Sequence, residues 1–423
     1  MYVPEPIIRK GFFWKAGCED HKASGILTIK NGGTCELEII GSLDEDQYKF
    51  LEGNLETNFT ICGNIDTDDY ATLYNCHYKK NNMSFNSGIT SSIIKPQRVI
   101  LGVAFDDLNP TPKYKKIRFE FTNTESWVDI SGFKRTHTQN QNNFLIEYNL
   151  PEKIQAELTN IGAFNIGFTN RPIILKTEIN SRQITYFEIE PTHPIDMENA
   201  VRLIRKIQDF LTFAIQKTVT IKNIKATLIT GLEAEETEYP FPVSWYYESP
   251  PSVAETAETK KEHVLFTTSE VLKTLEAKIN KFLELYETST PSFWLYISTL
   301  NGTHRYMEST FLSLSQASES YQRNISKTKN INFRNRIEAL TTPFTHLFKF
   351  DLGDFLDTTT NTRNYLTHYN EKIKAKSAYG FELYLLNKRL KDFITLNILK
   401  DIGFTQDEIA LISKKANLLI DNF

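Results

Sequence analysis

Residues 363–368 read Arg363-Asn364-Tyr365-Leu366-Thr367-His368, and this stretch joins three polar groups of distinct chemistry on one short predicted helix. An Arg supplies a fixed cation, a His supplies an imidazole that transfers protons near neutral pH, and an Asn supplies an amide that can orient either group. Apolar residues recur around the stretch at helical spacing, so it sits within a helical fold rather than a sheet.

Working outward from this stretch, the sequence predicts an α-helical bundle over residues 264–423. Apolar residues recur there every three or four positions, and alternating strand patterns are nearly absent. The expected helices cover about 268–287, 304–323, 333–347, 352–372, 377–400 and 405–421.

The other half of the chain, residues 1–245, has the pattern of a β-rich domain. Gly25–Lys30 and Cys35–Ile40 flank Asn31-Gly32-Gly33-Thr34, where two glycines suit the positive φ angles of a hairpin turn. Many short alternating runs with turn residues between them indicate a sandwich or a barrel-like domain. Further clear runs are Lys116–Phe121, Phe144–Tyr148, Tyr186–Glu190 and Val219–Leu228.

One amphipathic helix, at about 197–216, interrupts the β pattern, and Asp196 is placed to cap it. Residues 246–263 are then rich in Glu, Thr, Ser and Pro, which is typical of a linker. The sequence therefore predicts an α+β multidomain protein with a β-rich domain at 1–245, a linker at 246–263 and a helical domain at 264–423.

Composition narrows the class of protein. The net charge of −4 means that any nucleic-acid surface must be a local basic patch. No run of about 18 apolar residues suggests a membrane span, and Pro4, Glu5 and Pro6 stand where a signal peptide would be apolar. The four cysteines lack disulfide-dense or zinc-site spacing, so we expect a cytoplasmic protein with free thiols.

The Arg, Asn and His of the stretch fit the chemistry of RNA cleavage through the ribose. The 2′-OH would attack the adjacent phosphorus, His368 would act as base or acid, and Arg363 would neutralise the charge on the phosphorane. Asn364 would fix the imidazole or a phosphate oxygen. No carboxylate cage for a divalent ion is evident near the stretch, so we expect no metal and no cofactor.

The spacing of these residues suggests a site that two chains share. At about 100° per residue, Asn364 and His368 lie nearly on one face, whereas Arg363 and His368 differ by about 140°. Two copies that meet across a two-fold axis could place each Arg beside the partner's His, so we expect a homodimer. An ordinary surface helix carrying the same residues remains the alternative.

The segment Asn361–Tyr369 resembles the Arg-Asn-x-x-x-His signature of HEPN domains, a helical ribonuclease family of prokaryotic defence and toxin systems. More narrowly, the chain resembles ApeA-like proteins of anti-phage abortive infection, which join a β-rich N-terminal domain to a C-terminal HEPN domain. Ala200–Ile224 and Phe311–Tyr321 also match that pattern, although Ser318 replaces a larger apolar residue. The resemblance implies a homodimeric, metal-independent endoribonuclease and an N-terminal domain that senses a phage-derived trigger or restrains the nuclease.

Two further groups of residues are candidates for supporting roles. Glu319, four positions before Arg323 on a predicted helix, could orient Arg363 or His368, or could form only a surface pair with Arg323. Tyr369 would support the site beside His368. The densest basic stretch could hold RNA phosphates, or could be an ordinary solvated surface. Its candidate RNA-binding residues are Arg323, Lys327, Arg334 and Arg336.

The leading hypothesis is a defence effector that cleaves cellular RNA, with transfer RNA as the first substrate to test. Phosphate-cradling Gly-rich loops, Gly-x-Ser-x-Gly and His-Glu-x-x-His are absent from the sequence, which argues against NTPases, α/β-hydrolases and zinc proteases. One rival is a catalytically inactive HEPN bundle kept for dimerisation or RNA binding. Another makes the β domain a ligand-binding module and the helices an assembly handle.

Overall fold

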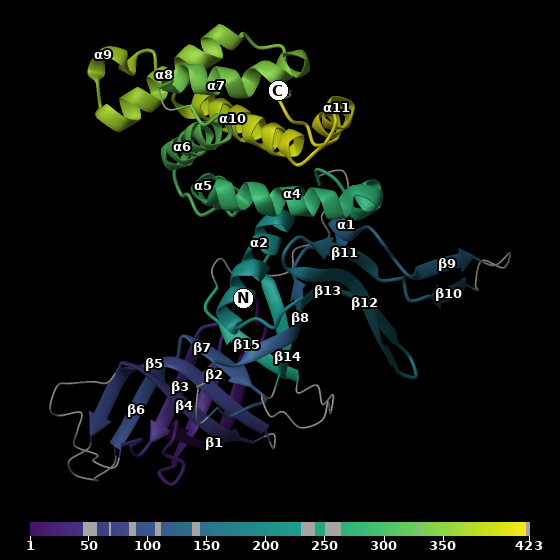
Figure 1. Ribbon diagram of the computed structural model, residues 1–423, viewed down its shortest axis with the longest axis vertical. Coiled ribbons are helices and arrows are strands. Elements are labelled where there is room, and N and C mark those ends of the chain that lie inside the picture. Colours follow the sequence, from purple (N-terminus) through teal and green to yellow (C-terminus); the bar gives the residue numbers. More distant parts are fainter. Residues whose placement is uncertain are drawn as a thin grey trace. The chain divides into compact units, whose positions relative to one another are not determined.

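A computed structural model of the chain describes residues 1–44, 57–66, 69–83, 90–105, 111–137, 144–229, 242–249, 264–328 and 330–419. The chain divides into two compact units, which we call the β unit and the helical unit (Figure 1). The β unit comprises 1–122, 131–204 and 220–255, and the helical unit comprises 123–130, 205–219 and 256–423. Among the described residues, no helix is both long and apolar enough to cross a membrane.

A closed barrel of six strands forms the first part of the β unit. The predicted hairpin is confirmed as β2 (Ala23–Ile29) and β3 (Cys35–Ile40), which pair antiparallel, with Gly32 and Gly33 both at positive φ in the turn. Strand β5 pairs with both β4 and β6, and this closes the barrel. Alternate residues point inward, so the interior is filled by apolar side chains such as Phe13, Leu27 and Leu73. The other barrel strands are β1 (Ile7–Lys15), β4 (Thr57–Ile65), β5 (Asp69–Met83) and β6 (Thr90–Lys95).

The length of β5 allows the sheet to continue beyond the barrel. Its last residues pair with β6, whereas Ala71–Tyr74 pair with β7, so one edge of the strand serves two neighbours. From β7 the sheet runs on in the order β15, β14, β8, β13, β12 and β11. Phe119, Phe164 and Phe187 stack in this part of the sheet, with centroids about 6 Å apart. These strands are β7 (Arg98–Leu101), β8 (Lys113–Phe121), β11 (Ile154–Leu158), β12 (Gly162–Ile174), β13 (Ile179–Pro191), β14 (Ile221–Ile229) and β15 (Pro242–Tyr247).

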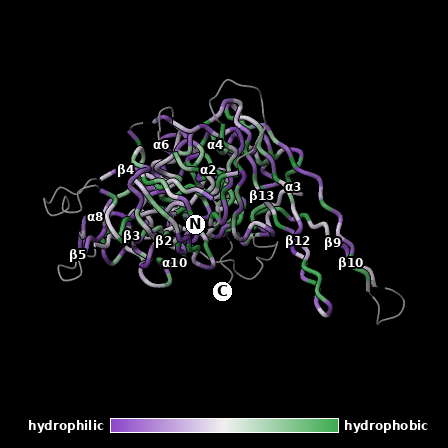
Figure 2. The backbone as a smooth tube through the Cα atoms, turned by 90° about the horizontal axis from the view of Figure 1, so that it is seen from below, coloured by the Kyte–Doolittle hydropathy of each residue, from purple (hydrophilic) through white to green (hydrophobic). Residues whose placement is uncertain are grey.

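Two hairpins extend from the β unit (Figure 2). Strands β9 (Phe133–His137) and β10 (Phe144–Tyr148) form a separate two-stranded sheet, which confirms the predicted strand at 144–148. The other hairpin is the far end of β12 and β13, where apolar side chains are exposed, including Ile174 at 72% and Ile179 at 73%.

Helix α2 (Met197–Ile215) confirms the predicted amphipathic helix and its cap, because Asn199 N–H donates to Asp196 Oδ1 at 2.9 Å. Its residues up to Ile204 belong to the β unit, and those from Arg205 onward belong to the helical unit. Strand β15 extends to Tyr247, and residues 250–263 of the predicted linker lie outside the described residues.

The helical unit packs around aromatic side chains. Phe282 contacts Phe210, Phe213 and Phe293, with ring centroids 5.1–5.8 Å apart. Most of the predicted helices are confirmed, several of them with shifted or shorter bounds, whereas α5 (Thr290–Leu300) was not predicted. The other helices are α1 (Glu125–Val128), α3 (Thr268–Val271), η3 (Leu272–Thr274), α4 (Leu275–Thr288), α6 (Met307–Ser326), α7 (Phe333–Thr341), η4 (Thr342–Leu347), α8 (Leu352–His368), α9 (Glu371–Lys374), α10 (Gly380–Asp401) and α11 (Gln406–Lys415).

Candidate active site

Helix α8 carries the Arg-Asn-x-x-x-His stretch in its last two turns. Asp351 begins the helix by accepting a hydrogen bond from Asp354 N–H at 2.8 Å. Phe355, Thr362 and Tyr365 lie on its buried face, and this fixes the rotation of the helix. Arg363 and Asn364 are consequently half-buried beside that face, and His368 is exposed at the last helical position.

Glu319 on α6 is brought to the Arg363 guanidinium. Its Oε2 atom lies 3.5 Å from Arg363 Nη2, while its Oε1 atom accepts a hydrogen bond from Arg323 Nη2 at 2.8 Å. The two pairings that the sequence offered as alternatives therefore coexist. One carboxylate shared by two guanidinium groups leaves a formal charge of about +1, which suits a phosphate ligand.

Two further contacts restrict Arg363. Its Nη1 atom donates to Asn364 Oδ1 at 3.3 Å, and its guanidinium lies 5.4 Å from the centroid of the Phe333 ring. The Asn364 amide thus contacts the arginine. A carboxylate, an amide and an aromatic ring hold the cation without burying it, since 31% of its side chain remains exposed.

His368 is open to solvent. In the part of the chain that the structure describes, its imidazole makes no hydrogen bond or ion pair with another residue. Both ring nitrogens are therefore available to take up or release a proton from a bound molecule.

Tyr369 follows His368 directly and ends the helix in a left-handed conformation, with φ at 49°. Its side chain is 73% exposed, and its ring lies 6.0 Å from that of Tyr365. The ring of Tyr379 also contacts Tyr365, with the two ring centroids 6.1 Å apart. Tyr379 was not among the residues predicted for the site. Partial desolvation and a hydrogen bond with Tyr365 raise the pKa of Tyr379 to about 12, so it stays a neutral phenol.

The segment between α8 and α10 is tied to the buried face of α8. The Thr362 hydroxyl accepts a hydrogen bond from Ala378 N–H at 2.9 Å and donates one to the Thr358 carbonyl at 2.7 Å. These bonds keep Tyr379 beside the end of α8. In the sequence, Tyr379 is one aromatic residue within the helix predicted at 377–400, a feature that is too common to mark a site.

The predicted RNA-binding residues fall into two groups. Arg323, Lys327 and Arg334 are at the surface, where Arg323 pairs with Glu319 and Arg334 with Asp357 at 2.8 Å. Arg336 is fully buried and donates to Gln322 Oε1 at 2.5 Å and to the Thr328 carbonyl at 3.0 Å. The prediction that Arg336 faces RNA is therefore wrong, because its guanidinium serves the interior of the bundle.

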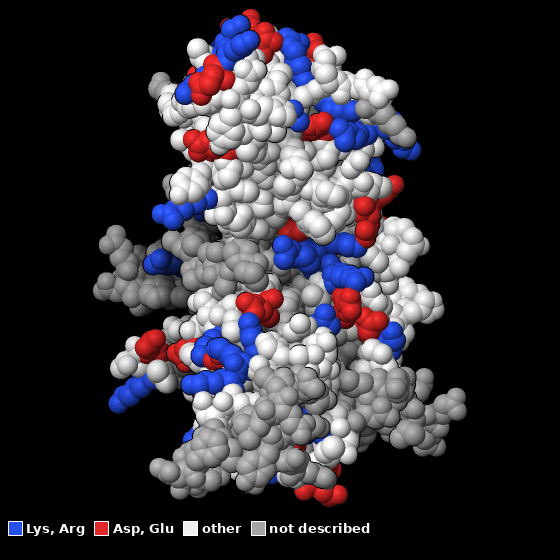
Figure 3. Space-filling model, turned by 90° about the vertical axis from the view of Figure 1, so that its left-hand side faces the viewer, with Lys and Arg blue, Asp and Glu red and all other residues white. Residues whose placement is uncertain are grey.

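Charge elsewhere is mixed. On the face drawn in Figure 3, basic and acidic side chains are interspersed.

Among the described residues, no group of three or more His, Cys, Asp or Glu side chains is arranged to hold a metal ion.

Comparison with known proteins agrees with the resemblance seen in the sequence. Residues 8–282 match the family described as ApeA N-terminal domain 1, and residues 271–408 match Apea-like HEPN. No curated protein and no solved structure matches the chain. HEPN domains are generally ribonucleases that commonly bind RNA and dimerise. Because the first match spans more than half of the sequence and the second contains the whole candidate site, the chain belongs to the ApeA-like family of anti-phage HEPN effectors.

Proposed function

We propose that this protein is a metal-independent endoribonuclease that cleaves cellular RNA during anti-phage abortive infection. The observation that carries the proposal is the restrained but open Arg363, which α8 holds near an exposed His368 within the HEPN match. A cation that is fixed yet accessible can meet a phosphate, and an unpartnered imidazole can exchange a proton with it.

The reaction we propose uses the RNA's own nucleophile. The ribose 2′-OH loses its proton to a His368 imidazole and attacks the adjacent phosphorus, while Arg363 stabilises the charge on the phosphorane. A protonated imidazole then gives a proton to the departing 5′-oxygen, which leaves a 2′,3′-cyclic phosphate and a 5′-hydroxyl. Glu319 acts as a positioning residue through Arg363, and Asn364 acts in the same way.

Unpaired RNA suits this site better than a regular duplex, because the 2′-OH must lie in line with the bond that breaks. The exposed Tyr369 ring next to His368 offers a flat surface on which an adjacent base can stack. Lys327, Arg323 and Arg334 would add contacts to phosphates along the strand. Transfer RNA, which has exposed loops, is the first substrate to test.

The geometry of α8 also favours a site shared between two chains. Arg363 and His368 lie about 140° apart around the helix, so one copy does not aim both at one phosphate. We infer a homodimer in which the Arg of one chain works beside the His of the other. The N-terminal domain would regulate this dimer in response to a phage-derived trigger.

The test is an RNA cleavage assay in EDTA with the full-length protein, Arg363→Ala, His368→Ala and the control His346→Ala. His346 is an exposed histidine of the helical unit outside the candidate site. We expect the first two variants to lose cleavage by at least about a hundredfold and the control to retain it. Wild-type cleavage by His368→Ala would overturn the mechanism. If the wild-type protein is silent, repeating the assay with phage-infected lysate separates a missing trigger from an inactive scaffold.

A further inference from the structure

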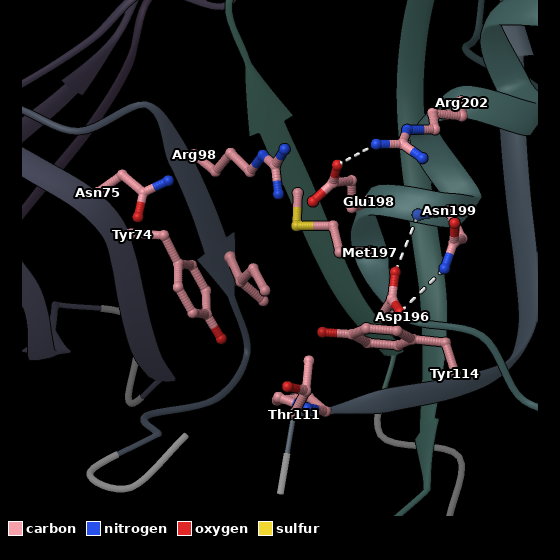
Figure 4. Close-up of a pocket in the computed structure, with 12 residues that line it drawn as sticks. Tyr74, Asn75, Arg98, Thr111, Tyr114, Asp196, Met197, Glu198, Asn199 and Arg202 are labelled. Atoms are coloured by element: carbon pink, nitrogen blue, oxygen red, sulfur yellow. Dashed lines mark hydrogen bonds and ion pairs between the residues drawn. The ribbon is translucent and has the colours of Figure 1, made fainter. Parts of the chain in front are cut away.

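A pocket of about 550 Å³ opens in the β unit beside the first turn of α2 (Figure 4). Its walls come from β5, β7, the start of β8 with the two residues before it, and the N-terminal residues of α2. Ligand sites for small molecules commonly measure about 300–1,000 Å³, so this pocket has room for a molecule of nucleotide size.

The charged groups of the pocket are balanced, with one exception. Arg202 pairs with Glu198 at 2.5 Å, and Asp196 pairs with Lys113 at 3.1 Å. Arg98, on β7, extends its guanidinium into the pocket (Figure 4), and none of the residues that the structure describes forms an ion pair or hydrogen bond with it. An unpaired guanidinium in a concave site favours an anionic ligand whose acid group can accept two parallel hydrogen bonds, such as a phosphate or carboxylate.

Two phenols supply hydrogen-bond donors on the opposite side. Tyr114 is 1% exposed, and its hydroxyl has no hydrogen-bond partner of ordinary geometry among the described residues. The hydroxyl ends of Tyr74 and Tyr114 both point into the pocket (Figure 4). Burial raises the pKa of both phenols, so both remain protonated donors at neutral pH. A buried hydroxyl without a partner is unfavourable, and an oxygen atom of a ligand would satisfy it.

The remaining wall includes apolar surface from Ile100, Pro112 and Met197. A flat ring can pack there while its charged group reaches Arg98. We propose that the pocket binds a nucleotide-sized anion, whose phosphate pairs with Arg98 and accepts hydrogen bonds from Tyr114 and Tyr74. This proposal does not depend on the nuclease activity, because binding is measured without RNA.

The test is calorimetric titration of the full-length protein with the four ribonucleoside 5′-monophosphates, with inorganic phosphate and with the uncharged nucleosides. We expect saturable binding of at least one monophosphate, at least about tenfold tighter than phosphate or its nucleoside alone. Arg98→Met should weaken that binding at least about tenfold, since it removes a charged hydrogen-bond donor. Arg171→Met, an exposed arginine on β12 outside this pocket, is the matched control and should change binding less than about twofold.

Tyr114→Phe separates binding from folding. It removes only a hydroxyl that makes no hydrogen bond of ordinary geometry and meets only the Trp245 indole, so the variant should unfold near the wild-type temperature and bind the monophosphate about five- to tenfold more weakly. Absence of binding by all four monophosphates at about 1 mM would overturn the proposal. Equal affinity for phosphate alone would overturn the role of the ring, and undiminished binding by Arg98→Met would overturn the role of the guanidinium.

Discussion

At the scale of single residues, the candidate site depends on a carboxylate that two guanidinium groups share. We expect Glu319→Gln to slow RNA cleavage about tenfold, because Arg363 would lose the ion pair that holds it toward α6. Stability should change by less than about 1 kcal/mol, since partly exposed ion pairs contribute little. Single-turnover cleavage of a defined RNA and thermal unfolding measure the two effects.

The matched control for Glu319 is Glu338→Gln, another helical carboxylate, which lies 3.7 Å from Arg334. It should leave the cleavage rate within about twofold of wild type. A wild-type rate for Glu319→Gln would mean that Arg363 needs no partner from α6.

The prediction that Arg336 faces RNA was wrong for a reason that lies at the scale of single residues. Arg334 and Arg336 stand about 200° apart around α7, so they face opposite sides of the helix. Phe333, Ile337 and Leu340 define the buried side, and Arg336 falls among them. The position of Arg336 on the apolar face of the helix therefore predicts that it is buried, whereas the number of basic residues in the stretch does not.

At the scale of elements, α8 ends at Tyr369, which has an unfavourable backbone conformation and an exposed ring. Tyr369 adopts φ 49°, a conformation that favours Gly, so Tyr369→Gly should stabilise the protein by about 1 kcal/mol. Cleavage should fall about five- to tenfold in the same variant, because the stacking surface beside His368 is lost. Urea unfolding and cleavage rates measure the two opposed effects.

Lys327→Gly is the stability control, since Lys327 ends α6 with φ 53°. It should gain a similar stability, and only its unfolding is compared, because Lys327 is itself a proposed phosphate contact. Wild-type cleavage by the stabilised Tyr369→Gly variant would show that the ring has no part in the reaction.

The pairing of β8 with β13 contains a buried charge cluster. Glu188 is fully buried and meets Lys116, Arg118 and Lys153 within 3.3 Å. Burial alone would raise the pKa of Glu188, but hydrogen bonds from Lys153 and Arg118 and the nearby charges lower it from 4.5 to about 2. The stability that it contributes is therefore complete above about pH 4.5 and is lost as the pH falls toward 2.

We expect Glu188→Gln to destabilise the protein by about 2 kcal/mol at pH 7, because three cations lose their common partner. The difference from wild type should shrink below about pH 4.5, where the wild-type carboxyl takes up its proton. Urea unfolding at pH 7 and pH 3 measures this. Glu120→Gln, a carboxylate on β8 outside the cluster, is the control, and a difference independent of pH would contradict the assignment.

Elements with a clear local pattern were predictable, and one without such a pattern was missed. The β2–β3 hairpin has its glycines and α2 has its apolar stripe, so the sequence alone identified both. Helix α5 reads Thr-Pro-Ser-Phe-Trp-Leu-Tyr-Ile-Ser-Thr-Leu, where aromatic and apolar residues occupy most faces and no stripe stands out. Pro291 in its first turn was the usable signal, because proline is favoured at that position.

At the scale of the whole molecule, the closure of the barrel could not be predicted from the sequence. It depends on β5, whose one edge pairs with β7 near its start and with β6 near its end. Alternation within a strand identifies its inward face but carries no information about a distant partner. The candidate site was more predictable, because Arg363, Asn364 and His368 lie within two turns of one helix.

A site shared between two chains can be tested by complementation. If each site takes Arg363 from one chain and His368 from the other, Arg363→Ala and His368→Ala proteins are each inactive but complement each other. A mixed dimer has one site that keeps both residues and one that lacks both, so a fully mixed population should recover about a quarter of wild-type activity. The measurement is RNA cleavage after the two purified variants are denatured together and refolded, with each variant refolded alone as the control. No recovery in a mixture whose mixed dimers are detected by native mass spectrometry would place both residues of a site on one chain. The RNA would then have to bend in order to reach both Arg363 and His368, which lie about 140° apart around α8.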